Sequence, residues 1–442
     1  MSQLAGSLTP VQPRRPDWKR IGLLAGLIAF IALCGVAILV LLGYNIGPDA
    51  LAVGVVAAII PVPVLVAAFF WLDRYKPEPI KYLAYCFAWG ACVATLVAFL
   101  LNNLAGWAFG KLHWPTALVA VLVAPFIEES MKALGPILLF WRRRRAFSGV
   151  VDGIVYCGLS ATGFAMVENI LYLGGYGYAS GADKGGVAGG LAGVIGLFIA
   201  RILLSGFAHP LFTSMTGVGL GVSARSGSRV VRRLAPVAGL LAAMTMHGSW
   251  NLMITIAQQT NQYLVQLYGY FSVMVPIFLG MVGLALYLRS SEGRLTERIL
   301  PEYVRAGWLT APEVATLVTM GRRMSARAWA KRVAGAEGDR AMRGYQFAAT
   351  QLALLRDGLQ RGLAMKPADL AAMLAEERRL LEAVAWYRGV FSQDPQAPPV
   401  TWDGGRYHVS FPDGSVRTVA PPELPVVPLP VVLPRYPQSG YR

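Results

Sequence analysis

Residues 118–141 read LVAVLVAPFIEESMKALGPILLFW, an apolar run that is long enough to cross a bilayer yet carries charges at its centre. Glu128 and Glu129 are adjacent, and Lys132 follows one helical turn later, on the same helix face as both carboxylates. An acid at the middle of a membrane helix costs roughly 2.5 to 3.5 kcal/mol. Two neighbouring acids therefore require a charged partner, a hydrated cavity or a chemical function.

The composition of the whole chain is that of an integral membrane protein. Of its 442 residues 55% are hydrophobic and 14% are charged, and the mean hydropathy is +0.50, which lies outside the range of ordinary soluble domains. Apolar stretches of about 20 residues or more predict an all-α polytopic membrane protein with eight transmembrane helices. The predicted spans are residues 21–43, 50–72, 81–102, 115–141, 150–173, 191–222, 235–257 and 268–288.

Basic residues predict the orientation of these spans, because Lys and Arg in short loops are retained on the cytoplasmic side. They gather before the first span and in the loops after the second, fourth and sixth spans, whereas the intervening loops hold only Lys111 and Lys184. We therefore expect a multi-pass protein of the cell membrane with both termini in the cytoplasm. The net charge of +16 is largely this topology signal together with a basic tail, and it predicts no nucleic-acid partner.

Changes in composition divide the chain into four parts. Residues 1–20 are a cytoplasmic N-terminal segment, and residues 21–288 form the transmembrane domain. Residues 289–392 predict a cytoplasmic region of two or three helices, with a capping box at Thr310–Glu313. Residues 393–442 predict a short β-hairpin within Trp402–Val419 and a proline-rich tail that favours an extended or disordered segment.

Three further predicted spans carry polar residues of their own. Glu168 lies in the fifth span, His209 lies in the sixth beside Pro210, and His247 and Asn251 lie in the seventh at i, i+4 spacing. One such residue is explained by structural pairing, but four helices with polar side chains at similar depth predict a common site. Prolines within these helices free carbonyl groups that a hydrated cavity can satisfy.

Two other features of these spans have less specific interpretations. Arg201 shares a helix face with His209 in the predicted sixth span, so it is placed to pair with Glu168, and we expect a structural role for it. Residues 174–190 are rich in glycine and predict an external loop that is either a gate or a plain linker.

The ordered set of motifs resembles the PrsW-type intramembrane proteases. Glu128–Lys132 is similar to their EExxK motif, Phe164–Glu168 is similar to their FxxxE motif, and His209 and His247–Asn251 also fit. The loop Asp73–Pro79 resembles an acidic, proline-containing loop of these proteins. Related CAAX-processing proteases have His where this chain has Glu, so the resemblance favours PrsW. It covers roughly residues 20–290, and it implies a bacterial membrane metalloprotease that cleaves membrane-protein substrates.

The residue types independently suit peptide hydrolysis. A carboxylate in a cavity takes a proton from water and returns it to the leaving amine, and Glu128 or Glu129 is the candidate for this role. We expect Lys132 to neutralise the other carboxylate and Asn251 to donate to the oxyanion. Glu168, His209 and His247 form either a metal-ligand set, with Zn²⁺ favoured, or a metal-free hydrogen-bonding cage.

Two other functions are compatible with buried polar residues. A proton- or solute-coupled transporter also places Glu, Lys and His inside the membrane, although the inverted repeat that would favour it is not evident between spans 1–4 and 5–8. A catalytically inactive scaffold that binds peptides in the membrane is the third hypothesis. The complete set of motifs favours the protease.

Overall fold

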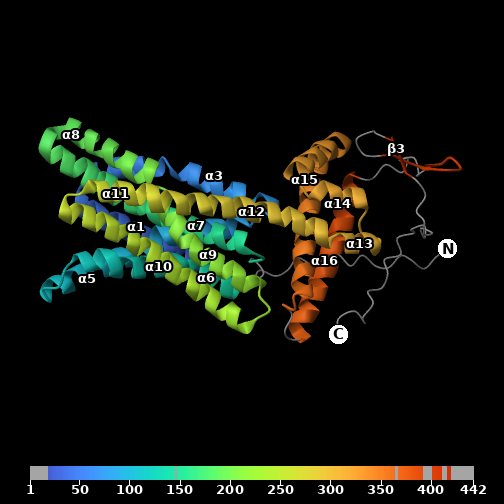
Figure 1. Cartoon of the computed structure of the whole chain (residues 1–442), viewed down its shortest axis with the longest axis horizontal. Helices are drawn as coiled ribbons and strands as arrows, with labels where there is room; N and C mark the ends of the chain where they lie inside the picture. The colour runs from blue at the N-terminus through green and yellow to red at the C-terminus, as the bar shows by residue number, and fades with distance from the viewer. Residues whose placement is uncertain (1–17, 145–146, 364–366, 392–400, 411–415, 420–442) are drawn as a thin grey trace.

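The computed structural model describes residues 18–144, 147–363, 367–391, 401–410 and 416–419. Within these ranges a long bundle of apolar helices carries a smaller group of helices at one end (Figure 1). The predicted N-terminal segment is described only from residue 18 onward, and the proline-rich stretch 421–437 lies outside the described residues.

The helices of the bundle follow one another along residues 18–299. They are α1 (Trp18–Ile46), α2 (Pro48–Ile59), α3 (Val62–Leu72), α4 (Ile80–Ala88), α5 (Thr95–Lys111), α6 (Ala124–Arg142), α7 (Val150–Ile170), α8 (Ser180–Phe198), α9 (Ala208–Arg225), α10 (Arg229–Thr260), α11 (Tyr263–Gly269) and α12 (Val275–Ile299). Short turns of wider, π-helical winding join or extend several of them, namely η2 (Trp89–Ala94), η3 (Val119–Val123), η5 (Leu171–Ala179), η6 (Ile199–Leu204) and η7 (Tyr270–Met274), and η1 (Asp73–Tyr75) is a 3₁₀ turn.

Five helical stretches of the described chain are long and apolar enough to cross a membrane. They are Trp18–Ile46, Pro48–Tyr75, Ile80–Lys111, Val150–Arg225 and Tyr263–Arg305. Helix α6 is not among the five, because Glu128, Glu129 and Lys132 lower its hydropathy. An all-α membrane protein is thus the observed class, and the count of eight spans stays a prediction.

Helix α7 is the centre of the bundle. All but three of its 21 residues are buried, and it packs against α2, α4, α6 and α9. Two glycines allow its backbone to approach these neighbours closely. A Cβ atom at Gly153 would lie 2.0 Å from the carbonyl oxygen of Gly217 on α9, and one at Gly163 would lie 2.1 Å from that of Phe87 on α4. Small residues permit this type of packing between membrane helices.

The glycine-rich stretch 174–190 is helical, so the prediction of a loop is wrong for this segment. Its residues belong to η5 and α8, and the chain reverses at Gly185 and Gly186, the latter with φ of 61°. The two arms lie close together, since a Cβ at Gly181 would be 2.4 Å from the carbonyl oxygen of Gly189. The glycines serve close helix packing here, and only the two at the reversal depart from helical geometry.

The predicted sixth span, residues 191–222, is interrupted in the structure. Helical winding ends with η6 at Leu204, and α9 begins at Ala208 after a turn. Pro210 lacks the amide that would continue the ladder to Gly206, which explains why the helix stops short of it. His209 consequently lies in the first turn of α9, beside irregular backbone of the kind that is tolerated where it lines a cavity.

The C-terminal helices form a separate core at one end of the bundle. They are α13 (Pro301–Arg305), α14 (Ala311–Leu317), α15 (Met320–Gln360) and α16 (Pro367–Phe391), which exceeds the two or three expected. The predicted capping box at Thr310 and Glu313 is present. The buried Arg323 ties this core to the bundle by donating to the carbonyl oxygen of Tyr75 at 2.8 Å, as well as to Leu317 and Thr350.

A small antiparallel sheet follows these helices. Its strands are β1 (Thr401–Trp402), β2 (Tyr407–Ser410) and β3 (Val416–Val419), in the order β1-β2-β3. The segment Trp402–Val419, for which a two-stranded hairpin is predicted, therefore contributes to three strands.

The loop from Asp73 to Pro79 is fixed by a buried ion cluster. The ammonium of Lys76 contacts Glu78, the Asp152 carboxylate at 2.8 Å and the Ser148 hydroxyl at 2.6 Å. Burial raises the pKa of Glu78 to about 7, and Tyr156 donates a hydrogen bond to its carboxylate. Asp152 also accepts from the backbone amide of Ser148 and so fixes the turn before α7. This cluster lies on the same side of the bundle as the C-terminal helices, to which Arg323 links the loop.

The loop charges predict on which side of the membrane each end of the bundle lies. A cysteine introduced at Lys184, which is exposed next to the Gly185–Gly186 reversal, should react with a membrane-impermeant maleimide from outside the cell. A cysteine at Arg340, which is exposed on α15, should react only after permeabilisation. The wild type is the background control, because three of its four cysteines are buried and Cys92 is partly so. Labelling of position 184 only from the cytoplasm would invert the map.

Candidate functional site

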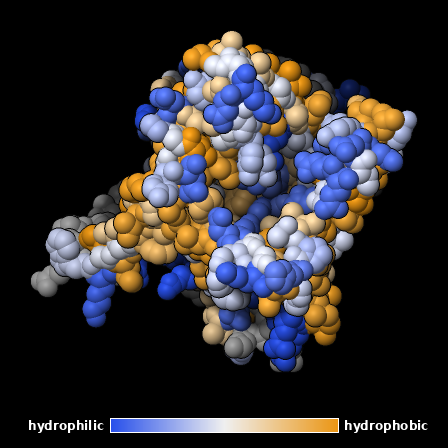
Figure 2. Space-filling view, turned by 90° about the vertical axis from the view of Figure 1, so that its left-hand side faces the viewer, coloured by the Kyte–Doolittle hydropathy of each residue, from blue (hydrophilic) through white to orange (hydrophobic). Residues whose placement is uncertain are grey.

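A polar cavity of about 650 Å³ lies among α5, α6, α7, α9 and α10. The chemistry-bearing side chains that line it are Glu128, Glu168, Arg201, His209, His247 and Asn251. Seen from the end of the bundle that lies opposite the C-terminal helices, the molecule has a hollow with hydrophilic residues at its centre (Figure 2). Residues that are far apart in the sequence therefore line one cavity, and its assignment as the functional site stays a prediction.

The ion pair between Glu129 and Lys132 lies behind the wall of this cavity. Both side chains are completely buried, and the Lys132 ammonium is 2.6 Å from Oε1 of Glu129. The same oxygen is 2.9 Å from Nδ1 of His247, and the other carboxylate oxygen accepts from the Thr213 hydroxyl at 2.7 Å. Each carboxylate oxygen of Glu129 thus has a protein partner, so this residue is arranged to hold its neighbours in place.

Glu128 is arranged differently, because it lines the cavity and one of its oxygens has no hydrogen-bond partner within the described ranges. Its Oε1 accepts from the amide of Asn102 at 3.2 Å. Its Oε2 lies 3.6 Å from the Lys132 ammonium and 3.9 Å from Nε2 of His247, and among the described residues this buried oxygen has no hydrogen-bond partner. A buried carboxylate oxygen without a partner is costly, which indicates a position for water or a cation.

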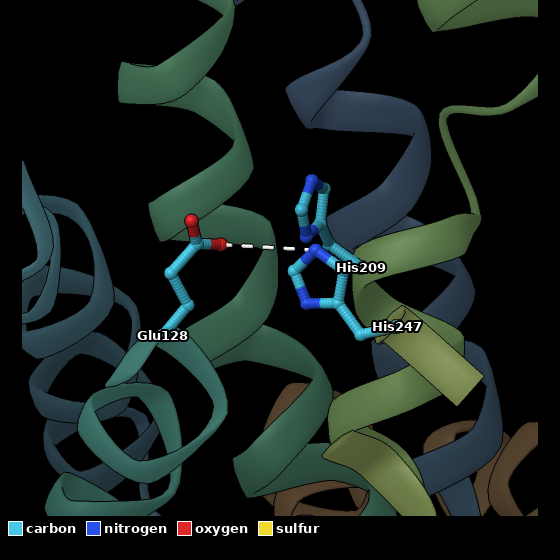
Figure 3. A group of neighbouring side chains, drawn as sticks. All are labelled: Glu128, His209 and His247. Atoms are coloured by element: carbon cyan, nitrogen blue, oxygen red, sulfur yellow. Dashed lines mark ion pairs between the residues drawn. The ribbon is translucent and has the colours of Figure 1, made fainter. Parts of the chain in front are cut away.

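Glu128, His209 and His247 form the group that could hold a metal ion. One ligand atom from each residue lies within 4.8 Å of those of the other two. Figure 3 shows the Glu128 carboxylate and the two imidazoles turned toward one another from three different helices, with the ion pair between Glu128 and His247 dashed. Because Nδ1 of His247 is bonded to Glu129, its Nε2 is the nitrogen left for a ligand.

Glu168, which the sequence assigns to the metal ligands, is engaged elsewhere. Its Oε2 is 2.8 Å from the Arg201 guanidinium and 2.9 Å from Nε2 of His209. The Arg201 guanidinium also lies 3.4 Å from the ring centroid of Tyr172, so it is held on two sides. The expected pairing of Arg201 with Glu168 is present, and in this geometry Glu128 rather than Glu168 shares the three-residue group with the histidines.

His209 bridges two charged groups. The Lys132 ammonium is 3.2 Å from its Nδ1, and since an ammonium only donates, this nitrogen is the acceptor. Nε2 then carries the proton and donates it to Glu168. For His209 to bind a metal held by Glu128 and His247, one of its ring nitrogens would have to release its contact with Lys132 or with Glu168.

Asn251 supports the backbone of the helix that carries Glu128. Its amide nitrogen donates to the carbonyl oxygen of Ala120 at 2.8 Å. In the π-helical turn η3 the carbonyl of Val119 is bonded to the amide of Ala124, five residues on. By the same register the carbonyl of Ala120 would require the amide of Pro125, which proline lacks. Asn251 supplies the missing donor with one of its two amide hydrogens, so the oxyanion role expected for it would fall to the other hydrogen.

Two residues that contact the site glutamates lie outside the sequence motifs. Asn102 reaches Glu128 from α5, and Thr213 reaches Glu129 from α9. Thr213 lies four residues after His209, so helical spacing places both on one face and could have signalled its role. Asn102 is an isolated amide within an apolar run, which is a weak signal by itself.

Residues 78–281 match the model of a known family, described as PrsW family intramembrane metalloprotease. This range contains every site residue named above. Three relatives are each named Protease PrsW. The protein of Clostridioides difficile is 28% identical over 200 residues, which are 44% of this chain and 77% of the relative. That of Geobacillus kaustophilus is 28% identical over 208 residues, 47% of this chain and 82% of the relative.

The protein of Bacillus subtilis is 27% identical over 214 residues, 47% of this chain and 86% of the relative. No solved structure matches this chain. The C-terminal helices begin after the matched range ends, so the similarity belongs to the membrane bundle. Residues 78–281, slightly less than half of the chain, thus match the model of PrsW family intramembrane metalloproteases and are similar to three relatives named Protease PrsW, and these matches support a peptidase.

Proposed function

We propose that this protease hydrolyses peptide bonds of membrane-protein substrates with a water molecule positioned by Glu128. The observation that supports this proposal is the Oε2 atom of Glu128, which is buried and lacks a hydrogen-bond partner among the described residues, in a side chain that lines the cavity. It lies within 4 Å of the Lys132 ammonium and of Nε2 of His247. A water molecule at this place would have an acceptor for its proton on one side and an imidazole on the other.

The two adjacent glutamates have separate roles in this proposal. Glu128 contacts the reacting water, whereas Glu129 is a positioning residue with both oxygens bonded to protein groups. Lys132 holds Glu129 and polarises Nδ1 of His209. We assign the reacting role to Glu128 rather than Glu129 because Glu128 lines the cavity and Glu129 does not.

The donor set fits a divalent metal, for which we propose Zn²⁺. Glu128, His209 and His247 would hold the ion, and three carboxylates against the two cations Lys132 and Arg201 leave the site one positive charge short. Zinc bound by three protein ligands lowers the pKa of its water and polarises a carbonyl group. Glu129 would orient His247 through Nδ1, as carboxylates commonly do for zinc-binding histidines.

Glu128 is required whether or not metal is bound, but its role differs between the two cases. Without metal, Glu128 takes the water proton and returns it to the leaving amine. If zinc were bound, Glu128 would be one of its ligands, and Glu168 would be the remaining carboxylate of the cavity that could hold a proton. Zinc content and activity together separate these two cases.

The substrate is a membrane protein whose scissile bond reaches the cavity from the end that Figure 2 faces. By the topology predicted from the loop charges, that end lies toward the outside of the cell. The proposal therefore places cleavage in the outer half of the membrane.

Replacement of Glu128 by Gln should abolish cleavage of a transmembrane substrate, because the amide keeps the shape of the carboxylate and cannot accept the proton or bind a cation well. Loss of a general base costs a factor of about 10² to 10⁴ in rate. The measurement is cleavage by purified protein in detergent, with Glu128→Ala for comparison and Thr213→Ser, which keeps the hydroxyl, as the matched control. Wild-type cleavage by Glu128→Gln would disprove the mechanism and return the transporter to consideration.

Metal content should follow the two histidines. Purified wild-type protein should carry about one zinc per chain, and His209→Ala and His247→Ala should carry none, since each removes a ligand. Glu129→Gln should weaken zinc binding by about 10- to 100-fold, as is typical for a lost outer-shell partner. His113→Ala lies outside the cavity and should keep its zinc. Full activity of metal-free protein would exclude zinc and leave Glu128 as the general base.

Asn251→Ala tests whether this amide supports the helix or the oxyanion. The variant leaves the carbonyl of Ala120 without its donor, which should lower stability by about 1–3 kcal/mol. Thermal unfolding in detergent measures this loss, and Gln258→Ala, a second amide of α10 that lines the cavity, is the control. A rate loss equivalent to about 2.7–4 kcal/mol at unchanged stability would instead assign Asn251 to the oxyanion.

A further inference from the structure

A second cavity of about 820 Å³ lies where the membrane bundle meets the C-terminal helices. One wall comes from the bundle and carries four arginines, Arg144, Arg229, Arg232 and Arg233. The opposite wall comes from α15 and α16 and is largely apolar, with Leu354, Leu355, Met373 and Leu380. Its volume is in the range of cavities that bind small molecules, about 300–1,000 Å³.

The arginines converge on this cavity from two elements. Arg229, Arg232 and Arg233 are spaced i, i+3 and i+4, which places them on one face of the first turns of α10. Arg144 approaches from the end of α6, and burial together with the charge of Arg232 lowers the pKa of its guanidinium. The cavity thus brings like charges together.

Carboxylates of the cavity do not balance these charges. Among the residues that the structure describes, Asp369 and Glu376 are the only carboxylates that line it, and Glu376 already pairs with Arg379 at 2.5 Å. Within the described ranges no ion pair joins Arg144, Arg229 or Arg233 to a carboxylate. Arg144, Arg229 and Arg233 therefore share the cavity with one carboxylate, Asp369, that no ion pair engages in the described part of the chain, which favours an anionic ligand, and the planar guanidinium suits phosphate.

The depth of the cavity indicates a lipid as the source of that anion. Trp141, which precedes the arginine-rich turn after α6, is exposed, as are tryptophans at the membrane–water interface. Helix α10 presents a continuous exposed apolar face from the same turn onward, formed by Val230, Leu234, Val237 and Leu241. A molecule with its anionic group among the arginines would therefore have an apolar helix face beside it for acyl chains.

We propose that this cavity binds the phosphate-bearing headgroup of an anionic phospholipid, with Arg144, Arg229 and Arg233 around the phosphate and the acyl chains along α10. Basic pockets at the ends of membrane helices commonly recognise such headgroups. The C-terminal helices close the cavity on its other side, so the bound lipid would contact both parts of the chain. This proposal is independent of the protease activity.

The test uses the full-length protein in nanodiscs or detergent and measures phosphatidylglycerol binding by native mass spectrometry. Wild-type protein should retain phosphatidylglycerol in preference to phosphatidylcholine. Arg229→Gln combined with Arg233→Gln should weaken that retention by about 30-fold, as expected for two arginines at an anionic membrane surface. Arg229→Lys combined with Arg233→Lys should recover much of the binding, because the charge is restored.

Lys19→Gln combined with Lys81→Gln removes two exposed cations outside the cavity and is the matched control. An equal loss in this control would show a general surface-charge effect and overturn the proposal. Equal retention of phosphatidylcholine by the wild type would also overturn it. Displacement of the lipid by millimolar inorganic phosphate would assign the cavity to a soluble phosphate compound instead. Thermal unfolding of each variant verifies that it is folded.

Discussion

The buried ion pair of Glu129 and Lys132 is the interaction on which the site depends. Both charges are removed from solvent, which is costly unless hydrogen bonds satisfy the remaining atoms. Here they do so, since Glu129 also binds His247 and Thr213 and Lys132 also contacts His209. Three helices are thereby fixed relative to one another by a single pair. Loss of one partner would leave an uncompensated charge, and it would also release the imidazole that the partner orients.

Backbone groups that lack their regular partners shape the same region. Pro125 leaves the carbonyl of Ala120 without an amide, and Asn251 compensates from a neighbouring helix. The interruption before α9 places irregular backbone and His209 side by side. In a bilayer such groups must be satisfied by protein or by trapped water. A hydrated cavity at this depth is consistent with both features.

Much of the fold and of the candidate site can be predicted from the sequence, and the predictions that fail do so for physical reasons. Apolar run lengths predict an all-α membrane protein, and among the intramembrane polar residues Glu128, Glu168, His209 and His247 line one cavity. The glycine content of residues 174–190 predicts a loop, and this prediction is wrong because glycine in a membrane bundle permits close helix packing as readily as it permits a turn. Which carboxylate joins the histidines could not be foreseen, since Glu128 and Glu168 differ only in their partners across helices. The hydrogen bond from Asn251 to Ala120 could not be predicted either, because it depends on the register of a π-helical turn.

The burial of α7 limits which parts of the protease can move. This helix is enclosed on all sides and touches two neighbours backbone to backbone, so a shift of any size would break many contacts at once. Helix α7 carries Glu168 and therefore forms a rigid wall of the cavity. Helix α5, by contrast, is exposed along much of its length and reaches the cavity through Asn102. A helix that enters the cavity from the lipid would thus displace the periphery of the bundle, and Glu168 would keep its place.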